Sequence, residues 1–460
     1  MPDWERIQAW AAQLDELVER IGARFARAEP RARVKAYLKG LMSDIRRKNG
    51  WQLAEHAGEA TPDGMQRLLD TAKWDVEGVR DDLRASVMEG LGTPEGVLVV
   101  DETGFVKKGT HSVGVKRQYS GTAGRVENGQ IGVFVGYASA KGQALIDREL
   151  YLPQEWAEDA ARRQEAQVPE TVTFATKPEL ARRMLERAFA AQVPCKWVTG
   201  DSIYGGDRRL RRWLEAQRRW FVLGVGKGEA LWGGGEQKRA DVWAATLPDA
   251  AWQRLSCGEG AKGPRVYDWA LLPLPRWGQV PDVRHALLVR RSLTDGEQAY
   301  LVVFAPAGTP LQTLVEVAGQ RWTIEACFEV AKNEVGLDEY EVRHWHGWYR
   351  HITLSMLALA FLTVMCSQAQ QEEKAEFPSS PCVADAVQPD VEEEGAKNNP
   401  LSLIAWLPLT VSEVRRLLST LVWTVVHAVE FILGWSFWRR RHQARAKACH
   451  YRRHLAQLPP

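Results

Sequence analysis

Three charged residues between Gln320 and Tyr340 are spaced so that they share one side of a helix. Arg321, Glu325 and Lys332 follow one another at intervals of four and seven residues, which places them at about 0°, 40° and 20° around a helix. The apolar residues of this stretch fall on an adjoining stripe, so the charged line borders the buried side. Such a line could hold a metal ion and a phosphate group. An i, i+4 ion pair is the simpler alternative.

Two more carboxylates follow predicted strands. Asp101 ends the apolar run of "GVLVVDETGF", and Asp201 ends that of "CKWVTGDSIYGG". If both strands end at one edge of a sheet, these carboxylates can converge with Glu325. Carboxylate oxygens are the ligands that Mg²⁺ and Mn²⁺ prefer, and two such ions can activate the attacking oxygen and stabilise the leaving one in phosphodiester displacement. We therefore predict that Asp101, Asp201 and Glu325 are catalytic and bind two ions of Mg²⁺ or Mn²⁺.

Each of these carboxylates has a neighbour that could replace it. Glu102 follows Asp101 but is expected to point to the opposite face of the strand. Asp207 lies close to Asp201, at the expected start of a helix, where aspartate is a good cap. Glu329 falls at about 80° on the helix and is the best substitute for Glu325.

Residues around the predicted centre could contact nucleic acid. Arg321 and Lys332 would neutralise phosphates beside the metal ligands, and Trp322 could stack on a splayed base. Lys107 and Lys108, which follow the first strand, could also touch DNA, or could simply keep a hairpin well hydrated. We predict these five residues as DNA contacts.

The pattern of helices and strands along the chain predicts an α/β protein with several domains, as expected for 460 residues. Residues 1–92 have a helical pattern, whereas 93–220 give three strands, a helix and a fourth strand. Residues 221–297 have strand patterns separated by glycine-rich turns and predict a β-rich insertion. Residues 298–365 contain the Glu325 helix, residues 366–400 have the acidic composition of a disordered linker, and residues 401–460 form a basic helical segment.

Charge is strongly segregated in a chain whose net charge is only +2. Residues 19–50 carry ten Lys or Arg and three acids, and residues 439–453 carry seven and no acid. Basic blocks of this kind indicate a polyanionic partner. The six cysteines form no CxxC pair, so neither a zinc site nor a disulfide framework is indicated.

Targeting and membrane signals are weak. The first ten residues do not resemble a signal peptide. The apolar stretch at residues 418–438 contains His427 and Glu430, which are costly in a bilayer, so we interpret it as a buried or partner-packing helix. We expect no membrane association and a bacterial cytoplasmic, nucleoid-associated protein.

Three other motifs have simpler explanations. Residues 49–75 predict two short helices around a turn, which is compatible with a helix-turn-helix reader but also with an ordinary helical hairpin. The glycine-rich residues 224–235 lack the GK[ST] of a nucleotide-binding loop. The "HWHGW" stretch from His344 to Trp348 offers imidazoles, but its flanking tryptophans favour packing or DNA contact over metal binding.

Arg321, Glu325 and Lys332 match the last three members of the signature Y-(2)-R-(3)-E-(6)-K. This signature is typical of the insertion-sequence 4 group, and the chain resembles the related bacterial DDE transposases of the insertion-sequence 701 family. "VVDETGFVKKG", "GDSIYGGDRRLR" and "GLDEYEVRHWHGWYRHITL" stand where such proteins carry comparable blocks. The resemblance covers roughly residues 20–365, and the tail more loosely. It departs at Ala318, where the signature has tyrosine.

The resemblance implies an RNase H-like catalytic core with a β-rich insertion, an N-terminal helical DNA-binding domain and a basic helical C-terminal segment. It also implies cleavage of double-stranded DNA at the ends of an insertion sequence, joining to target DNA, and a homodimer that holds two ends together. The residues by themselves support metal-dependent phosphoryl transfer on nucleic acid. A nuclease that cuts without joining, and an inactive DNA-binding descendant of a transposase, remain alternatives.

Overall fold

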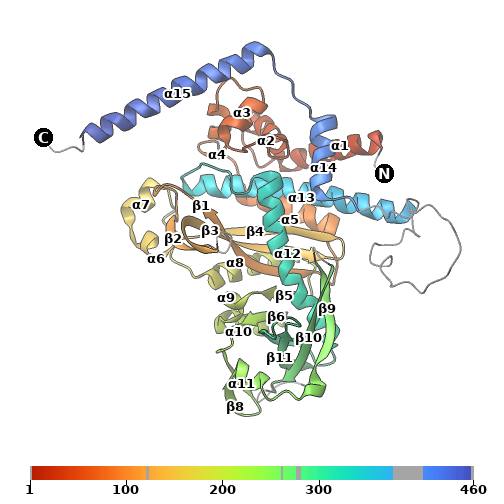
Figure 1. Ribbon diagram of the computed structural model, residues 1–460. Helices are drawn as coiled ribbons and strands as arrows, with labels where there is room; N and C mark the ends of the chain where they lie inside the picture. The colour runs from red at the N-terminus through yellow and green to blue at the C-terminus, as the bar shows by residue number, and fades with distance from the viewer. Residues whose placement is uncertain (1–2, 121–123, 261–262, 276–280, 377–407, 457–460) are drawn as a thin grey trace.

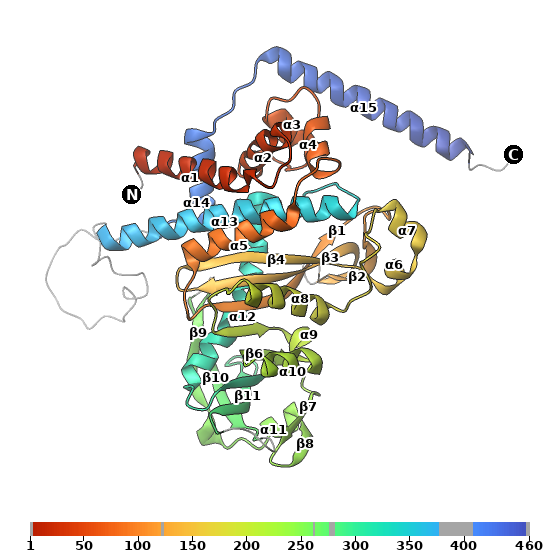
Figure 2. The same cartoon turned by 180° about the vertical axis from the view of Figure 1, so that it is seen from behind.

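The computed structural model describes residues 3–120, 124–260, 263–275, 281–376 and 408–456. It has a large mixed sheet with helices on both faces (Figures 1 and 2). Five helices come before the first strand, and asparagine or aspartate side chains cap α1, α3 and α5 at their first turns. They are α1 (Trp4–Gly22), α2 (Ala28–Leu41), α3 (Gly50–His56), α4 (Asp63–Leu69) and α5 (Val76–Leu91).

The sheet contains ten strands within the described residues, in the order β2-β3-β1-β5-β6-β12-β11-β10-β9, with β4 on β3. Strand β1 pairs antiparallel with β3, which pairs antiparallel with β4, whereas β5 and β6 run parallel to β1. The first six strands are β1 (Val97–Val106), β2 (Lys116–Ser120), β3 (Arg125–Ser139), β4 (Gly142–Tyr151), β5 (Trp197–Gly200) and β6 (Trp220–Val225).

Strands β9, β10 and β11 of the predicted β-rich insertion continue this sheet, whereas its β7 and β8 pair in a separate two-stranded sheet. Strand β12 pairs with β6, and β11, β10 and β9 follow outward. Strand β6 therefore belongs to the central sheet. The segment also contains a short helix, α11 (Ala240–Ala244). Its strands are β7 (Ala230–Gly233), β8 (Glu236–Arg239), β9 (Gln253–Gly260), β10 (Gly263–Pro273) and β11 (Val283–Arg291), followed by β12 (Gln298–Pro306).

Two long helices and α8 hold the sheet between them. Helix α12 (Leu311–Val335) runs along one face from β9 to β1, and α8 (Lys177–Ala190) covers the other (Figures 1 and 2). Helix α13 (Trp345–Glu376) packs against α5 and β4. Within the described residues it alone is long and apolar enough to span a membrane, but 94% of its apolar window is buried in the protein. It is thus placed as a core helix.

The C-terminal segment returns to the helical layer formed by α1–α4. Helix α13 continues to Glu376, so residues 366–376 are helical where a linker was predicted; residues 377–400 lie outside the described residues. After α14 (Val411–Leu417) and a short π-helix (Leu418–Val422), α15 (Val429–Ala456) extends away from the body (Figure 1). Trp435 at its start donates to the Glu59 carbonyl at 2.8 Å.

A buried ionic network joins the sheet to α5 and α8. Asp147 on β4 is 1% exposed and accepts hydrogen bonds from Arg187 at 2.9 and 3.1 Å and from Arg80 at 3.1 Å. Arg148, fully buried, is paired with Glu77 of α5. Despite burial, these cations hold the Asp147 pKa below its usual value. Each buried charge of this network is therefore neutralised by its partners, so that removing one leaves an unpaired charge inside the protein.

Removing the central charge of this network tests its contribution to stability. Asp147→Asn keeps the volume but leaves buried arginines without their partner, which should cost about 3–5 kcal/mol of unfolding free energy. Denaturant titration would measure it, with Glu186→Gln as a control because Glu186 pairs with Arg182 on the exposed face of α8. Similar unfolding midpoints for the two variants would contradict this role.

Candidate active site

Asp101 and Asp201 are brought together by the parallel pairing of β1 and β5. The register aligns Val100 with Gly200, so the two aspartates occupy the next position on neighbouring strands. Asp201 also caps the short helix α9 (Ser202–Gly205) and accepts a hydrogen bond from the Ile203 amide at 2.9 Å. The two aspartates are therefore neighbours on the parallel pair inside the sheet, but Asp101 lies within β1 and not at its end, where the sequence analysis placed it.

Glu325 on α12 lines the same cavity as the two aspartates. Asp101, Asp201, Glu325, Arg321 and Lys332 all line one cavity of about 1030 Å³. The Glu325 carboxylate accepts a hydrogen bond from Arg321 one turn earlier, and its side chain is 51% exposed. Among the described residues, the three triad carboxylates are not all within 4.8 Å of one another. The triad thus consists of two adjacent half-buried aspartates and a more exposed glutamate in the same cavity.

The electrostatics of the aspartate pair favour a bound cation. Burial, and then the charge of Asp201, raise the pKa of Asp101 to about 7. The pKa of Asp201 is also raised, by burial first and then by the charge of Glu102. The positive charge of Arg321 acts in the opposite direction and lowers both pKa values, but less than burial raises them. A divalent ion would offset this repulsion, and an all-carboxylate donor set fits Mg²⁺ or Mn²⁺.

The rival carboxylates have distinct environments. Asp207 caps α10 (Arg208–Ala216) and accepts from the Leu210 amide at 2.7 Å, as expected of a structural cap. Glu329 lines the cavity one turn after Glu325. Glu102 also lines the cavity, although strand alternation predicted that it would point to the opposite face from Asp101. Lys177 at the start of α8 contacts it.

Two residues around Glu102 were missed in the sequence. Lys177 at the start of α8 donates to Glu102 at 2.6 Å, and the Tyr204 hydroxyl donates to its other oxygen at 2.6 Å. Burial, and then the Glu102 charge, hold the Tyr204 pKa well above its usual value, so it remains a donor. The only local signal was the tyrosine three residues after Asp201. Together they keep the Glu102 carboxylate engaged by protein donors.

The predicted DNA contacts divide into accessible and occupied groups. Lys108 is exposed, but Lys107 donates to the Tyr340 carbonyl at 3.0 Å and lies over the Tyr340 ring. Burial lowers the Lys107 pKa to about 8. Lys332 lines the cavity while donating to Thr103 at 2.8 Å and to the Gly104 carbonyl at 3.2 Å. Nothing in the geometry of Lys107 supports a DNA contact.

Trp322 lies among arginines from three elements. Its ring centroid is 4.7 Å from the Arg265 guanidinium, 5.3 Å from that of Arg290 and 4.9 Å from that of Arg321. Tyr267 lies nearly parallel to it at 6.5 Å. Helix α12 thereby joins the insertion strands to the cavity through a cationic and aromatic cluster, in which base stacking by Trp322 remains a prediction.

Comparisons with known proteins support the resemblance seen in the sequence. The family described as DDE superfamily endonuclease matches residues 20–247. A probable transposase for insertion sequence element IS701 from Microchaete diplosiphon is 30% identical over 167 residues, which are 36% of this chain and 41% of that protein. The matched region is thus well under half of the relative's length. These two matches confirm the resemblance to DDE-type transposases of this family.

A solved structure is also similar over most of the chain. It is the cryo-EM structure of a piggyBac transposase synaptic complex with hairpin DNA, with a TM-score of 0.38 and 11% sequence identity. The match covers 87% of this chain and 68% of the other. A likeness at this level carries no conclusion about fold or function.

The raised Asp101 pKa predicts a specific pH dependence of stability in the metal-free protein. The folded pKa of about 7 exceeds the unfolded value near 3.9, so this group's stability contribution is present below about pH 4 and lost as pH rises through about 7. Asp101→Asn lacks this loss, so with a chelator present it should unfold at higher denaturant than wild type at pH 8, by a difference that shrinks as pH falls toward 4. Glu329→Gln is the control; equal pH dependence in wild type and Asp101→Asn would contradict the assignment.

Proposed function

We propose that this chain, whose residues 20–247 match the DDE superfamily endonucleases, is a transposase that cleaves the ends of an insertion sequence and joins them to target DNA. The observation that carries the proposal is the aspartate pair of β1 and β5, facing Glu325 and Arg321 in one cavity. Carboxylates that line one cavity with Arg321 and Lys332 suit a reaction in which phosphates and divalent ions meet.

The core of the sheet supports an RNase H-like assignment. Strands β4, β3 and β1 form an antiparallel set, and β5 and β6 extend it in parallel with β1. This order of three antiparallel and two parallel strands is the arrangement expected of an RNase H-like core. Asp101 lies on β1 and Asp201 directly follows β5, the neighbouring strand inside the sheet.

In the proposed mechanism, Asp101, Asp201 and Glu325 would hold Mg²⁺ or Mn²⁺. When bound, two such ions supply Lewis acid activation of the attacking oxygen and stabilisation of the leaving oxygen. To hold an ion together with the aspartates, Glu325 would have to leave its ion pair with Arg321. That would free Arg321 to bind a phosphate. Lys332, held by Thr103, keeps a positive charge at the cavity wall.

The binding of double-stranded DNA is proposed to involve surfaces outside the cavity. Helix α15 carries the basic block of residues 439–453, and residues 440–450 are exposed along its projecting part. Phosphate contacts there would hold the DNA without reading its sequence. Two ends must be cut together, so we propose a homodimer in the complex with DNA.

Glu325 and Glu329 provide a matched pair for testing the catalytic assignment. Both line the cavity one helical turn apart, but only Glu325 is proposed as a metal ligand. With end DNA and Mg²⁺, Glu325→Gln, Asp101→Asn and Asp201→Asn should each lose strand cleavage, while Glu329→Gln retains it. Gel analysis of labelled ends would measure cleavage and joining separately.

The opposite result for the two glutamates would assign the metal to Glu329. Cleavage without joined product in the wild type would instead support a nuclease without strand transfer. An inactive wild type that still binds end DNA would support the DNA-binding descendant.

Substitutions on α15 separate holding DNA from cutting it. Each neutralised phosphate contributes roughly −0.9 to the slope of log K against log salt concentration on duplex DNA. Replacing Arg440, Arg441 and Arg445, all exposed, by Gln should flatten this slope by about two to three units. Glu325→Gln should keep the wild-type slope. An unchanged slope in the triple variant would leave residues 19–50 as the main basic surface for DNA.

A further inference from the structure

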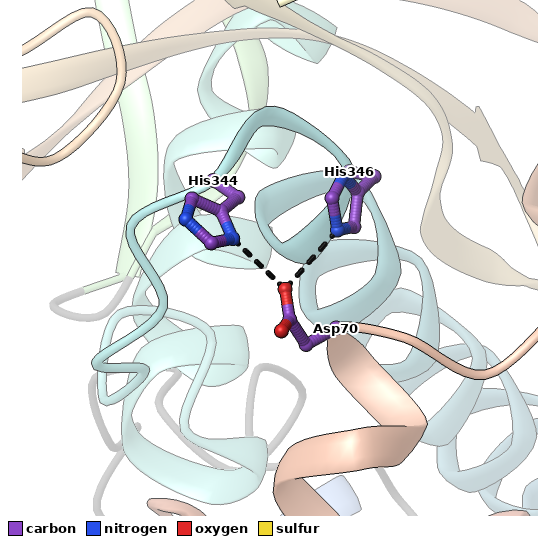
Figure 3. A group of neighbouring side chains, drawn as sticks. All are labelled: Asp70, His344 and His346. Carbon is purple, nitrogen blue, oxygen red and sulfur yellow. Dashed lines mark hydrogen bonds and ion pairs between the residues drawn. The ribbon is translucent and has the colours of Figure 1, made fainter. Parts of the chain in front are cut away.

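Asp70, His344 and His346 form a compact group outside the proposed active site. Asp70 is the residue that ends α4, His344 precedes α13, and His346 lies in the first turn of α13. His344 Nδ1 lies 2.8 Å, and His346 Nε2 3.2 Å, from the same Asp70 oxygen Oδ1. Figure 3 shows both rings, from the start of α13, turned toward this one oxygen at the end of α4.

This geometry is close to that of a metal site. One ligand atom from each of the three side chains lies within 4.8 Å of the other two, and within the described residues no other group of three or more His, Cys, Asp or Glu does so. Ligands about 2.1 Å from a tetrahedral Zn²⁺ are about 3.4 Å apart. An ion would therefore require the two nitrogen–oxygen contacts to lengthen by about 0.6 and 0.2 Å.

The group is accessible to an ion from solvent. The Asp70 side chain is 44% exposed, that of His344 35% and that of His346 29%. Asp70 and His344 also line a cavity of about 290 Å³ between the helical layer and the loop before α13. An ion could enter here and keep a water molecule as its fourth ligand.

The surroundings position Asp70 without filling a ligand place. Arg350 donates to the main-chain carbonyls of Asp70 and Ala72, the latter at 2.6 Å, which fixes the end of α4. Its positive charge opposes a bound cation and should make the site weaker than a closed four-ligand zinc site.

We propose that Asp70, His344 and His346 bind a divalent first-row transition-metal ion, with Zn²⁺ as its probe, that ties the end of α4 to the start of α13. Imidazole nitrogens favour such ions, whereas Mg²⁺ prefers oxygen ligands, so this site differs chemically from the carboxylate centre. The ion would brace the N-terminal helical layer against the core. This role does not depend on the proposed reaction.

The test measures Zn²⁺ binding to the full chain in excess Mg²⁺, by competition with a chromophoric chelator, together with the thermal midpoint. The wild type should bind one equivalent and unfold at higher temperature with Zn²⁺. His344→Asn and His346→Gln keep a side-chain N–H donor toward Asp70 but lose the imidazole. Each should therefore retain the metal-free midpoint and bind Zn²⁺ at least about tenfold more weakly.

Two controls locate the ion. His111→Asn removes an exposed histidine that pairs with Glu165 alone, and Asp101→Asn removes a carboxylate of the proposed active site. Both should bind Zn²⁺ as the wild type does. The proposal is overturned if the wild type binds no Zn²⁺, which would leave an ion pair between Asp70 and two histidines. It is also overturned if His344→Asn and His346→Gln bind Zn²⁺ unchanged.

Discussion

The hydrogen-bonded parallel pairing of β1 with β5 is the constraint on which the candidate site depends. It sets Val100 beside Gly200, and the next residues on the two strands are Asp101 and Asp201. A side chain at Gly200 would place its Cβ 2.6 Å from the Val100 side chain, so this close pairing requires glycine. The strand register therefore brings two half-buried carboxylates together, and their partial burial and the neighbouring negative charges raise their pKa values.

Helix α12 couples this centre to the outer strands of the sheet. A Cβ at Gly319 would lie 1.8 Å from the Cys257 carbonyl of β9, so the helix meets that strand at a position that admits only glycine. Buried Ala318 precedes it, where the related signature has tyrosine. The same helix then presents Arg321 and Glu325 to the cavity. Its position is thus set by the β-rich segment as much as by the core.

Local patterns were sufficient to identify the elements that carry the site. The apolar run before Asp101 forms the first half of β1, and the run before Asp201 forms β5. The residues spaced around Glu325 lie on α12. Contacts between distant segments could not be predicted in this way. Lys107 looked like a surface residue, yet it lies over Tyr340, 233 positions later.

Pairing partners within the sheet were similarly out of reach. The strand pattern of residues 221–225 was recognised, but its membership of the central sheet depends on hydrogen bonds to β5 and β12. The two histidines of "HWHGW" had no acid at a metal-ligand spacing, because Asp70 lies 274 positions earlier and reaches them only through the fold. Sequence spacing can identify metal ligands that share one helix or strand, but not ligands that come together from distant segments.

Anomalous scattering from Mn²⁺ in crystals of the protein with end DNA would show whether Asp101, Asp201 and Glu325 hold the metal ions. We predict Mn²⁺ between Asp101 and Asp201, with the Glu325 carboxylate turned from Arg321 to complete the ligand set. Mn²⁺ coordinated by Glu102 or Glu329 in place of this triad, or absent from the cavity altogether, would contradict it.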